Sequence, residues 1–359
     1  MNRIEVTGAK RVVIKIGSSS LTGEAGSQLN ESAVSKIVDL VATLTKRGAE
    51  VALVTSGAIA TGLAPLGLKT RPKDLATQQA AASVGQGLLI AKYNQNFARH
   101  SIVSSQVLLT TEDVVRRSHY QNAQQTLFKL LSLGVVPIIN ENDSVGTQEI
   151  RFGDNDRLAA LVALLIGADL LVLISDVDAL YDAPPSQPGA KAIHLVNAIS
   201  DIESVVLGGA GTAGVGSGGM VTKIEAARIA TGAGISMLLT SLEKAEQALS
   251  GAEVGTFFVA HGVRTNSRLL WLAHASTPQG RLILDAGAVT AILERGVSLL
   301  PAGVTAVEGE FISGDTVELV GPDKKVIARG LVAFDSDEIP QMLCRSTKEL
   351  AASLGAEYE

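Results

Sequence analysis

Cysteine is almost absent from this 359-residue sequence, because Cys344 is the only one. A single cysteine excludes an intrachain disulfide and a structural zinc site built from cysteines. No apolar run reaches the length of about 20 residues that a membrane-spanning helix needs. The N terminus, MNRIEVTGAKRVVIKIG, reaches polar residues too early for a secretory signal. We therefore expect a soluble, untargeted protein of the reducing cytosol.

The sequence is rich in aliphatic residues, with 46% hydrophobic and 18% charged residues, which is typical of an α/β core. Its length predicts one large domain with a smaller companion. The chain from Gln279 onward has 7 Lys+Arg against 13 Asp+Glu. This tail therefore accounts for the whole net charge of -6, and the preceding residues are neutral overall. An acidic tail disfavours contact with a phosphate backbone, so nucleic-acid binding is not expected.

Short β-branched runs alternate with longer amphipathic stretches over roughly the first 260 residues, as in βα units around a mainly parallel sheet. The runs lack polar alternation, so both faces of the predicted sheet should be buried. The expected strands are 11–16, 51–55, 135–139, 170–175 and 235–240. The expected helices are 30–46 with Asn30 as its N-cap, 75–99, 119–133, 155–166 and 220–231.

The tail departs from this alternation. Its runs EFISGDTVELV (310–320) and KKVIARGLVAF (324–334) are separated by glycine, proline and aspartate, a pattern typical of β-hairpins. We therefore predict a large α/β domain at 1–264, a connector at 265–278 and a small β-rich domain at 279–359.

The first candidate site is KIGSSSLT, residues 15–22, where a predicted strand carries Lys15 and breaks at Gly17. Small residues allow a phosphate to approach backbone N–H groups, and a lysine adds positive charge. A solvated lysine in an ordinary strand-to-helix turn is the more common explanation of such a segment, so this motif alone decides nothing.

The second candidate is the glycine-rich run GGAGTAGVGSGGM (208–220), which leads into a predicted helix with Lys223 in its first turn. A helix N terminus offers N–H donors and a favourable dipole to polyphosphate. The GxGxxG spacing inside the run arises by chance in any long glycine loop, and Ile224 after the lysine excludes a Walker loop. A flexible linker remains the alternative.

Polar residues also follow several predicted strands, in VTSGAIATG (54–62), INENDSV (139–145), GDND (153–156) and LISDVDALYD (173–182). Open α/β sheets bind ligands beyond the carboxyl ends of their strands. Each segment alone can be explained as a helix cap or a turn. Their number at one predicted sheet edge favours a ligand site.

In this order and spacing, the motifs KIGSSSLT, VTSGAIATG, INENDSV, FGDNDRLAA, ISDVDALYD and GSGGMVTK resemble the amino-acid kinase family over nearly the whole chain, and the tail resembles a PUA domain. The resemblance implies an α/β fold: a three-layer αβα sandwich with a mostly parallel central sheet, plus a small β-rich PUA-like C-terminal domain. Among the family's reactions, the resemblance implies ATP-dependent phosphorylation of the L-glutamate side-chain carboxylate to L-glutamyl 5-phosphate, the first step of proline biosynthesis. A kinase for another carboxylate or for carbamate is one alternative, and an RNA-binding module is another.

The resemblance also assigns roles to residues. Lys15 and Lys223 would neutralise the transferred phosphoryl group, and Asp156 would orient both lysines. The residues implied to contact ATP are Lys15, Ser175, Asp176, Ser217, Gly218, Gly219, Met220, Val221, Thr222 and Lys223. Those implied to bind glutamate are Ser56, Asp143, Asp154 and Asn155.

The same resemblance implies Mg²⁺ carried by the nucleotide, with no metal site of the protein's own, proline as an inhibitor, and a homo-oligomer. The chemistry is consistent with it. A glutamate side chain has an ordinary pKa of about 4.3, so it is already an ionised nucleophile at neutral pH. A general base is not required, which agrees with five histidines scattered without partner motifs.

Overall fold

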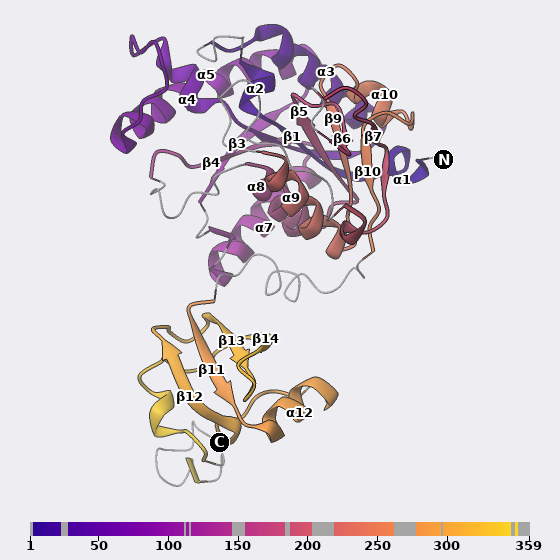
Figure 1. The fold of residues 1–359 in the computed structure, drawn as a ribbon. Helices are drawn as coiled ribbons and strands as arrows, with labels where there is room; N and C mark the ends of the chain where they lie inside the picture. Colours follow the sequence, from indigo (N-terminus) through magenta and orange to yellow (C-terminus); the bar gives the residue numbers. More distant parts are fainter. Residues whose placement is uncertain are drawn as a thin grey trace. The chain divides into compact units, whose positions relative to one another are not determined.

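The computed structural model describes residues 3–22, 28–110, 113–114, 116–145, 155–183, 187–202, 219–261, 278–295, 297–345 and 349–350. The chain forms two compact units that divide near residue 267, and Figure 1 traces both. The predicted connector lies almost entirely outside the described residues, so the proposed domain boundaries stay a prediction.

An eight-stranded sheet forms the centre of the first unit, in the order β3-β4-β2-β1-β5-β9-β10-β8. The six strands from β3 to β9 are parallel, and β10 runs antiparallel to β9. The predicted mostly parallel sheet is therefore confirmed. The strands are β1 (Arg11–Ile16), β2 (Glu50–Thr55), β3 (Ser104–Leu109), β4 (Val136–Glu141), β5 (Leu170–Ser175), β8 (Leu195–Val196), β9 (Ser236–Ser241) and β10 (Thr256–Phe258).

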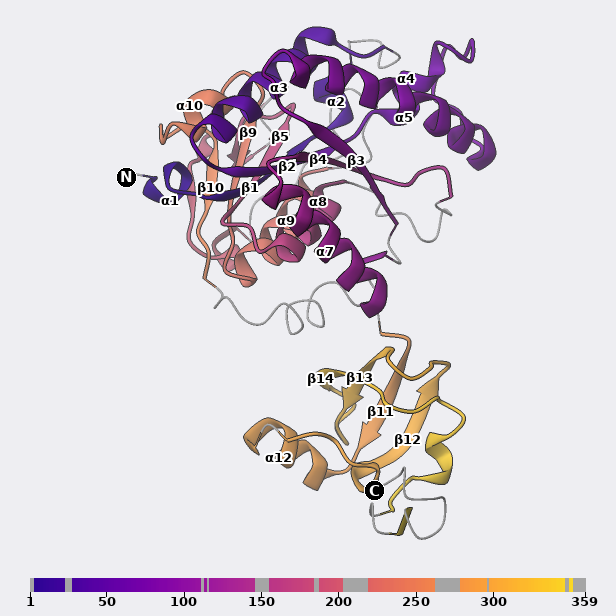
Figure 2. The ribbon, with the colours of Figure 1, turned by 180° about the vertical axis from the view of Figure 1, so that it is seen from behind.

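Helices cover both faces of this sheet, which gives the three layers (Figure 1, Figure 2). One face carries α3 and α5, and the opposite face carries α7, α8 and α9. Most of the buried side chains are aliphatic, because central strands such as β5 are enclosed on both faces. The helices of this unit are α1 (Ile4–Thr7), α2 (Ser18–Leu21), α3 (Glu31–Lys46), α4 (Ala58–Leu63), α5 (Leu75–Ala98), α7 (Arg117–Ser132), α8 (Asn155–Ile166), α9 (Met220–Gly232) and α10 (Ala245–Leu249).

The predicted strands and helices all exist, with bounds that differ by no more than two residues. Asn30 caps α3 as expected, since its side chain accepts a hydrogen bond from the backbone N–H of Ala33 at 3.2 Å. Strand β3 was not predicted. Its sequence SSQVLL begins with polar residues, and it lies at the sheet edge with only Leu109 buried, so it lacks the continuous apolar run of the central strands. In the part of the chain described above, no helix is long and apolar enough to span a membrane.

The second unit is a four-stranded sheet in the order β12-β11-β13-β14, with α12 (Ala286–Arg295) following β11. Its strands are β11 (Gly280–Leu284), β12 (Val304–Gly309), β13 (Thr316–Val320) and β14 (Val326–Leu331). β13 and β14 pair antiparallel, so the predicted hairpin is confirmed. Leu282, Phe311 and Val317 belong to a separate apolar core within this unit. The prediction of a small β-rich tail is therefore correct.

A close contact between two glycines holds α4 against α5. A Cβ atom added to Gly85 would lie 1.8 Å from the carbonyl oxygen of Ala58, and one added to Gly62 would lie 1.9 Å from that of Ala81. Real Cβ atoms do not approach backbone oxygens so closely, so only glycine permits this spacing. The contact fixes the start of α4, which directly follows Ser56 and Gly57 at the end of β2.

Replacement of Gly85 by alanine is expected to destabilise the chain by about 1–3 kcal/mol or more, because α4 and α5 must move apart. The matched control is Gly87→Ala on the same helix, where an added Cβ meets nothing within 4 Å. That variant should be neutral or slightly stabilising. Urea unfolding of both variants measures the difference, and equal stabilities would contradict the close contact.

Candidate functional site

Three charged side chains are buried together at the carboxyl edge of the parallel strands. Lys15 lies on β1, Asp156 in the first turn of α8, and Lys223 in the first turn of α9. Lys15 Nζ is 2.5 Å from Asp156 Oδ1, and Lys223 Nζ is 3.0 Å from Asp156 Oδ2. Their side chains are 5%, 1% and 8% exposed in the order Lys15, Asp156 and Lys223. Asp156 therefore binds one ammonium group with each carboxylate oxygen. We call this group the Lys15–Asp156–Lys223 cluster.

The cluster has an excess of positive charge. Burial alone would raise the pKa of Asp156, but the neighbouring Lys15 and Lys223 ammonium groups outweigh it and hold that pKa well below its usual range. Two ammonium groups share one carboxylate, so these three side chains together carry one net positive charge in a place with little water. Such a charge is stabilised by an incoming anion, and the surrounding protein strengthens that attraction.

Backbone features make the same edge accessible to an anion. Helix α9 begins directly after Gly219, and Thr222 Oγ1 donates to Gly219 O at 2.8 Å and to Asp156 Oδ2 at 3.2 Å. Both α8 and α9 start at the cluster, so the positive ends of their dipoles lie there. Gly17 lies beside Lys15, since a Cβ added to it would be 3.6 Å from Lys15 Nζ, and it carries no side chain next to the ammonium group.

A chain of amide side chains lies at the start of α8. Asn155 Nδ2 donates to the carbonyl oxygen of Thr55 at 2.6 Å, to Ser56 Oγ at 2.9 Å and to Asn140 Oδ1 at 2.8 Å. Asn140 Nδ2 in turn donates to Gln86 Oε1 at 2.8 Å. These bonds join the ends of β2 and β4 to α5 and α8, so polar groups from four elements are held in one arrangement.

The structure brings together Lys15, Asp156, Thr222 and Lys223, and separately Ser56 and Asn155. Ser175 and Asp176 lie at the end of β5, next to β1, where Ser175 Oγ donates to Asp176 Oδ1 at 2.8 Å. Gly219, Met220 and Val221 form the start of α9. Asp143 lies in the turn after β4. Three predicted site residues lie outside the described residues: Asp154, Ser217 and Gly218.

Sequence reasoning missed Gln86. It lies on α5 in line with Ala82, Leu89 and Tyr93, all of which are buried, and it is itself only 7% exposed. A single amide on an otherwise apolar helix stripe is a signal that the sequence does contain. Thr55 was missed for a different reason: it contributes its backbone carbonyl, which no side-chain pattern reveals.

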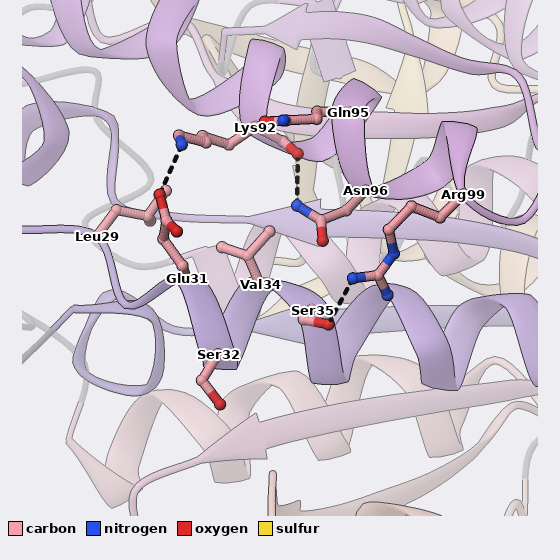
Figure 3. A pocket seen from close by; sticks show the side chains of 9 residues that line it. All are labelled: Leu29, Glu31, Ser32, Val34, Ser35, Lys92, Gln95, Asn96 and Arg99. Atoms are coloured by element: carbon pink, nitrogen blue, oxygen red, sulfur yellow. Dashed lines mark hydrogen bonds and ion pairs between the residues drawn. The ribbon is translucent and has the colours of Figure 1, made fainter.

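A separate hollow of about 440 Å³ lies between α3 and α5 (Figure 3). Lys92 Nζ bonds Glu31 Oε1 at 2.6 Å across it, and Arg99 bonds Ser35 Oγ at 3.1 Å and Asp39 Oδ1 at 2.7 Å. Its cations each have an acidic partner that is largely exposed, whereas the Lys15–Asp156–Lys223 cluster is buried.

Comparison with known proteins identifies the class. Residues 10–241 match the amino acid kinase family, and residues 280–354 match the PUA domain. The glutamate 5-kinase of Streptomyces avermitilis is 60% identical over 99% of this chain and 94% of that protein. The glutamate 5-kinase of Salinispora arenicola is 58% identical over 99% of this chain and 96% of that protein.

Among solved structures, carbamate kinase from Giardia lamblia bound to AMP-PNP aligns with a TM-score of 0.51 over 71% of this chain and all of that chain. At 18% identity, this similarity concerns the fold alone. The chain belongs to the amino acid kinase family, the class that its sheet and its paired lysines define. Within that family its place is among the glutamate 5-kinases, with a PUA domain after the kinase domain.

Proposed function

We propose that the chain transfers the γ-phosphoryl group of ATP to the side-chain carboxylate of L-glutamate, giving ADP and L-glutamyl 5-phosphate, the first step of proline biosynthesis. The identity of 60% and 58% to two glutamate 5-kinases, over 99% of this chain, supports the reaction. The structural observation that carries it is the Lys15–Asp156–Lys223 cluster, because two buried ammonium groups on one carboxylate form a site for a transferring phosphoryl group.

The reaction needs positioning and charge neutralisation. A carboxylate oxygen of glutamate attacks the γ-phosphorus, and the bond to the β–γ bridging oxygen breaks, so ADP leaves with that electron pair. The nucleophile is already ionised at neutral pH, since its ordinary pKa is about 4.3, and no proton has to be removed. Lys15 and Lys223 would stabilise the negative charge on the phosphoryl oxygens, while Asp156 keeps both ammonium groups in place.

The remaining site residues divide between the two substrates in this proposal. Ser56, Asp143 and Asn155 would bind glutamate, assisted by Asp154. Ser175, Asp176 and the start of α9, with the preceding residues from Ser217, would bind ATP.

Mg²⁺ would enter with the nucleotide. Within the described ranges, no group of three or more His, Cys, Asp or Glu side chains could hold a metal ion, and both Asp156 oxygens already face lysines. Mg²⁺ commonly binds substrate phosphates with few protein ligands, so this arrangement fits a nucleotide-borne ion. The ion would offset phosphate charge alongside the two lysines.

Purified protein incubated with ATP, Mg²⁺ and L-glutamate tests the proposal, with hydroxylamine present to trap the acyl phosphate as a hydroxamate. We expect ADP and hydroxamate to form in equal amounts and only with glutamate. A parallel panel of N-acetylglutamate, aspartate and carbamate separates this reaction from those of related kinases. Preference for one of these acceptors, or no glutamate-dependent product, would refute the assignment.

Two further properties belong to the proposal. Proline is expected to inhibit by overlapping the glutamate site near Asp143 and Asn155, and the protein is expected to form a homo-oligomer in the cytosol. Hydroxamate formation at increasing proline concentration tests the first property, and activity indifferent to millimolar proline would contradict it. Light scattering of the full chain tests the second.

A further inference from the structure

Gln86 is a buried glutamine that the reaction described above does not use. It lies on α5, is 7% exposed, and accepts a hydrogen bond through Oε1 from Asn140 Nδ2 at 2.8 Å. Its Nε2 is also buried and, within the residues that the structure describes, has no hydrogen-bond partner. Methionine or leucine would fill the same space but would leave Asn140 Nδ2 without its acceptor, so the glutamine serves the amide chain and not packing alone.

The direction of the amide chain is fixed by backbone groups at two points. Asn140 Oδ1 accepts from the backbone N–H of Glu141 at 2.9 Å, and a backbone N–H can only donate. Asn140 therefore directs Nδ2 toward Gln86, and Gln86 accepts this hydrogen bond through Oε1. At the other end, Asn155 Nδ2 donates to the carbonyl oxygen of Thr55, which can only accept.

This direction determines what Asn155 can offer a substrate. Its Nδ2 is engaged by Thr55 O, Ser56 Oγ and Asn140 Oδ1, which already exceeds its two hydrogens. The opposite end of the amide is Oδ1, an acceptor. An acceptor suits the α-ammonium group of an amino acid and repels a carboxylate.

We infer that Gln86 is a positioning residue for the glutamate subsite: by accepting from Asn140 it fixes the amide chain through which Asn155 presents its oxygen to the substrate. The inference rests on the proposed function. Gln86 acts through Asn140 and Asn155 and has no part in holding ATP. Its loss should therefore affect one substrate and leave the other unchanged.

Gln86→Met tests this inference by steady-state kinetics of the full chain. Methionine has a similar volume but offers no comparable acceptor, so Asn140 and then Asn155 lose their fixed orientation. We expect KM for glutamate to rise about tenfold, the equivalent of one hydrogen bond, with KM for ATP unchanged within about twofold. The melting temperature should stay close to that of the wild type, because the unmet donor that is lost with Gln86 Nε2 offsets the one that arises at Asn140 Nδ2.

Two variants complete the design. Gln86→Glu keeps an oxygen acceptor for Asn140 and should restore KM for glutamate most of the way to the wild-type value. Gln95→Met makes the same substitution at an exposed position of the same helix and should change neither KM. If methionine prevents folding, Gln86→Ser replaces it, since serine is too short to reach Asn140.

The outcomes separate the inference from the function on which it rests. Wild-type protein without glutamate-dependent hydroxamate formation would refute the proposed function itself. Active wild type together with an unchanged KM for glutamate in Gln86→Met, or an equal rise in both KM values, would overturn the positioning role. Failure of Gln86→Glu to recover would overturn the argument from the acceptor oxygen.

Discussion

Lys223→Met is expected to lower kcat by about 10³-fold, the scale on which one cation contributes to phosphoryl transfer, while KM for ATP and glutamate changes little. Lys223 Nζ lies 3.0 Å from Asp156 and is buried, so its charge is available to phosphoryl oxygens without reorganising water. That charge matters most when the bond to ADP is breaking. The loss should therefore appear in the chemical step, which initial-rate and single-turnover measurements of hydroxamate formation resolve.

Lys92→Met is the control for this variant. Lys92 is also a lysine in an ion pair, with Glu31 at 2.6 Å, but its side chain is 43% exposed and lies on α5 beside the hollow of Figure 3. Exposed pairs of this kind contribute little, so both kcat and stability should match the wild type. An unchanged kcat in Lys223→Met would remove this lysine from the proposed mechanism.

Asp156→Asn is expected to abolish most activity and to lower the free energy of unfolding by about 3–5 kcal/mol. The substitution leaves the Lys15 and Lys223 ammonium groups buried without a counter-charge. They then repel each other, and neither keeps its position beside the phosphoryl group. Denaturant unfolding and the hydroxamate assay measure the two effects on the same preparation.

The stability loss has a defined pH dependence. The pKa of Asp156 is depressed in the folded chain by Lys15 and Lys223, against the raising effect of burial, relative to an ordinary value near 3.9. Its contribution is therefore fully present above that unfolded value and is lost as the pH falls toward the depressed folded value. The difference between wild type and Asp156→Asn should stay constant from about pH 5 to 7 and shrink below about pH 4.

Asp39→Asn provides the matched control, because Asp39 also has two basic side chains within hydrogen-bond distance. Arg99 Nη2 and His100 Nε2 each lie 2.7 Å from Asp39 Oδ1, but the Asp39 side chain is 48% exposed. Solvent screens this pair, so the substitution should cost no more than about 1 kcal/mol. If Asp39→Asn lowered the free energy of unfolding as much as Asp156→Asn, burial would not be the reason for the large effect at the cluster.

The sequence allowed the central architecture to be predicted because its signals are local. Strand β5 is an almost continuous apolar run, β1 is apolar apart from Arg11 and Lys15, and Asn30 marks the start of α3. Strand β3 was not predicted, because a strand at the edge of a sheet tolerates polar residues and lacks a continuous apolar run. The convergence of Lys15, Asp156 and Lys223 could be predicted only through the ordered motifs, since parallel topology carries their elements to one edge.

The amide chain could not be predicted from local patterns. Its bonds join Gln86, Asn140 and Asn155, which are distant in sequence and meet only after the sheet and both helices have formed. The α4–α5 contact is similar, because nothing in the sequence says that Gly62 and Gly85 face backbone oxygens whereas Gly87 faces open space. Such features depend on distances between individual atoms of different elements. Sequence periodicity predicts which face of a helix or strand is buried, but not these contacts.

Because two lysines share one carboxylate, the site has its net positive charge only when all three of its elements are assembled. With β1 and α8 assembled but α9 not docked, Lys15 and Asp156 form a pair with no net charge, which has no excess positive charge for the phosphoryl oxygens as the bond to ADP breaks. Only the arrival of Lys223, 67 residues beyond Asp156, turns the pair into a cation. A chain in which α9 has not docked therefore lacks the cationic site for the transferred phosphoryl group, and the ability to catalyse the transfer appears only once α9 is in place.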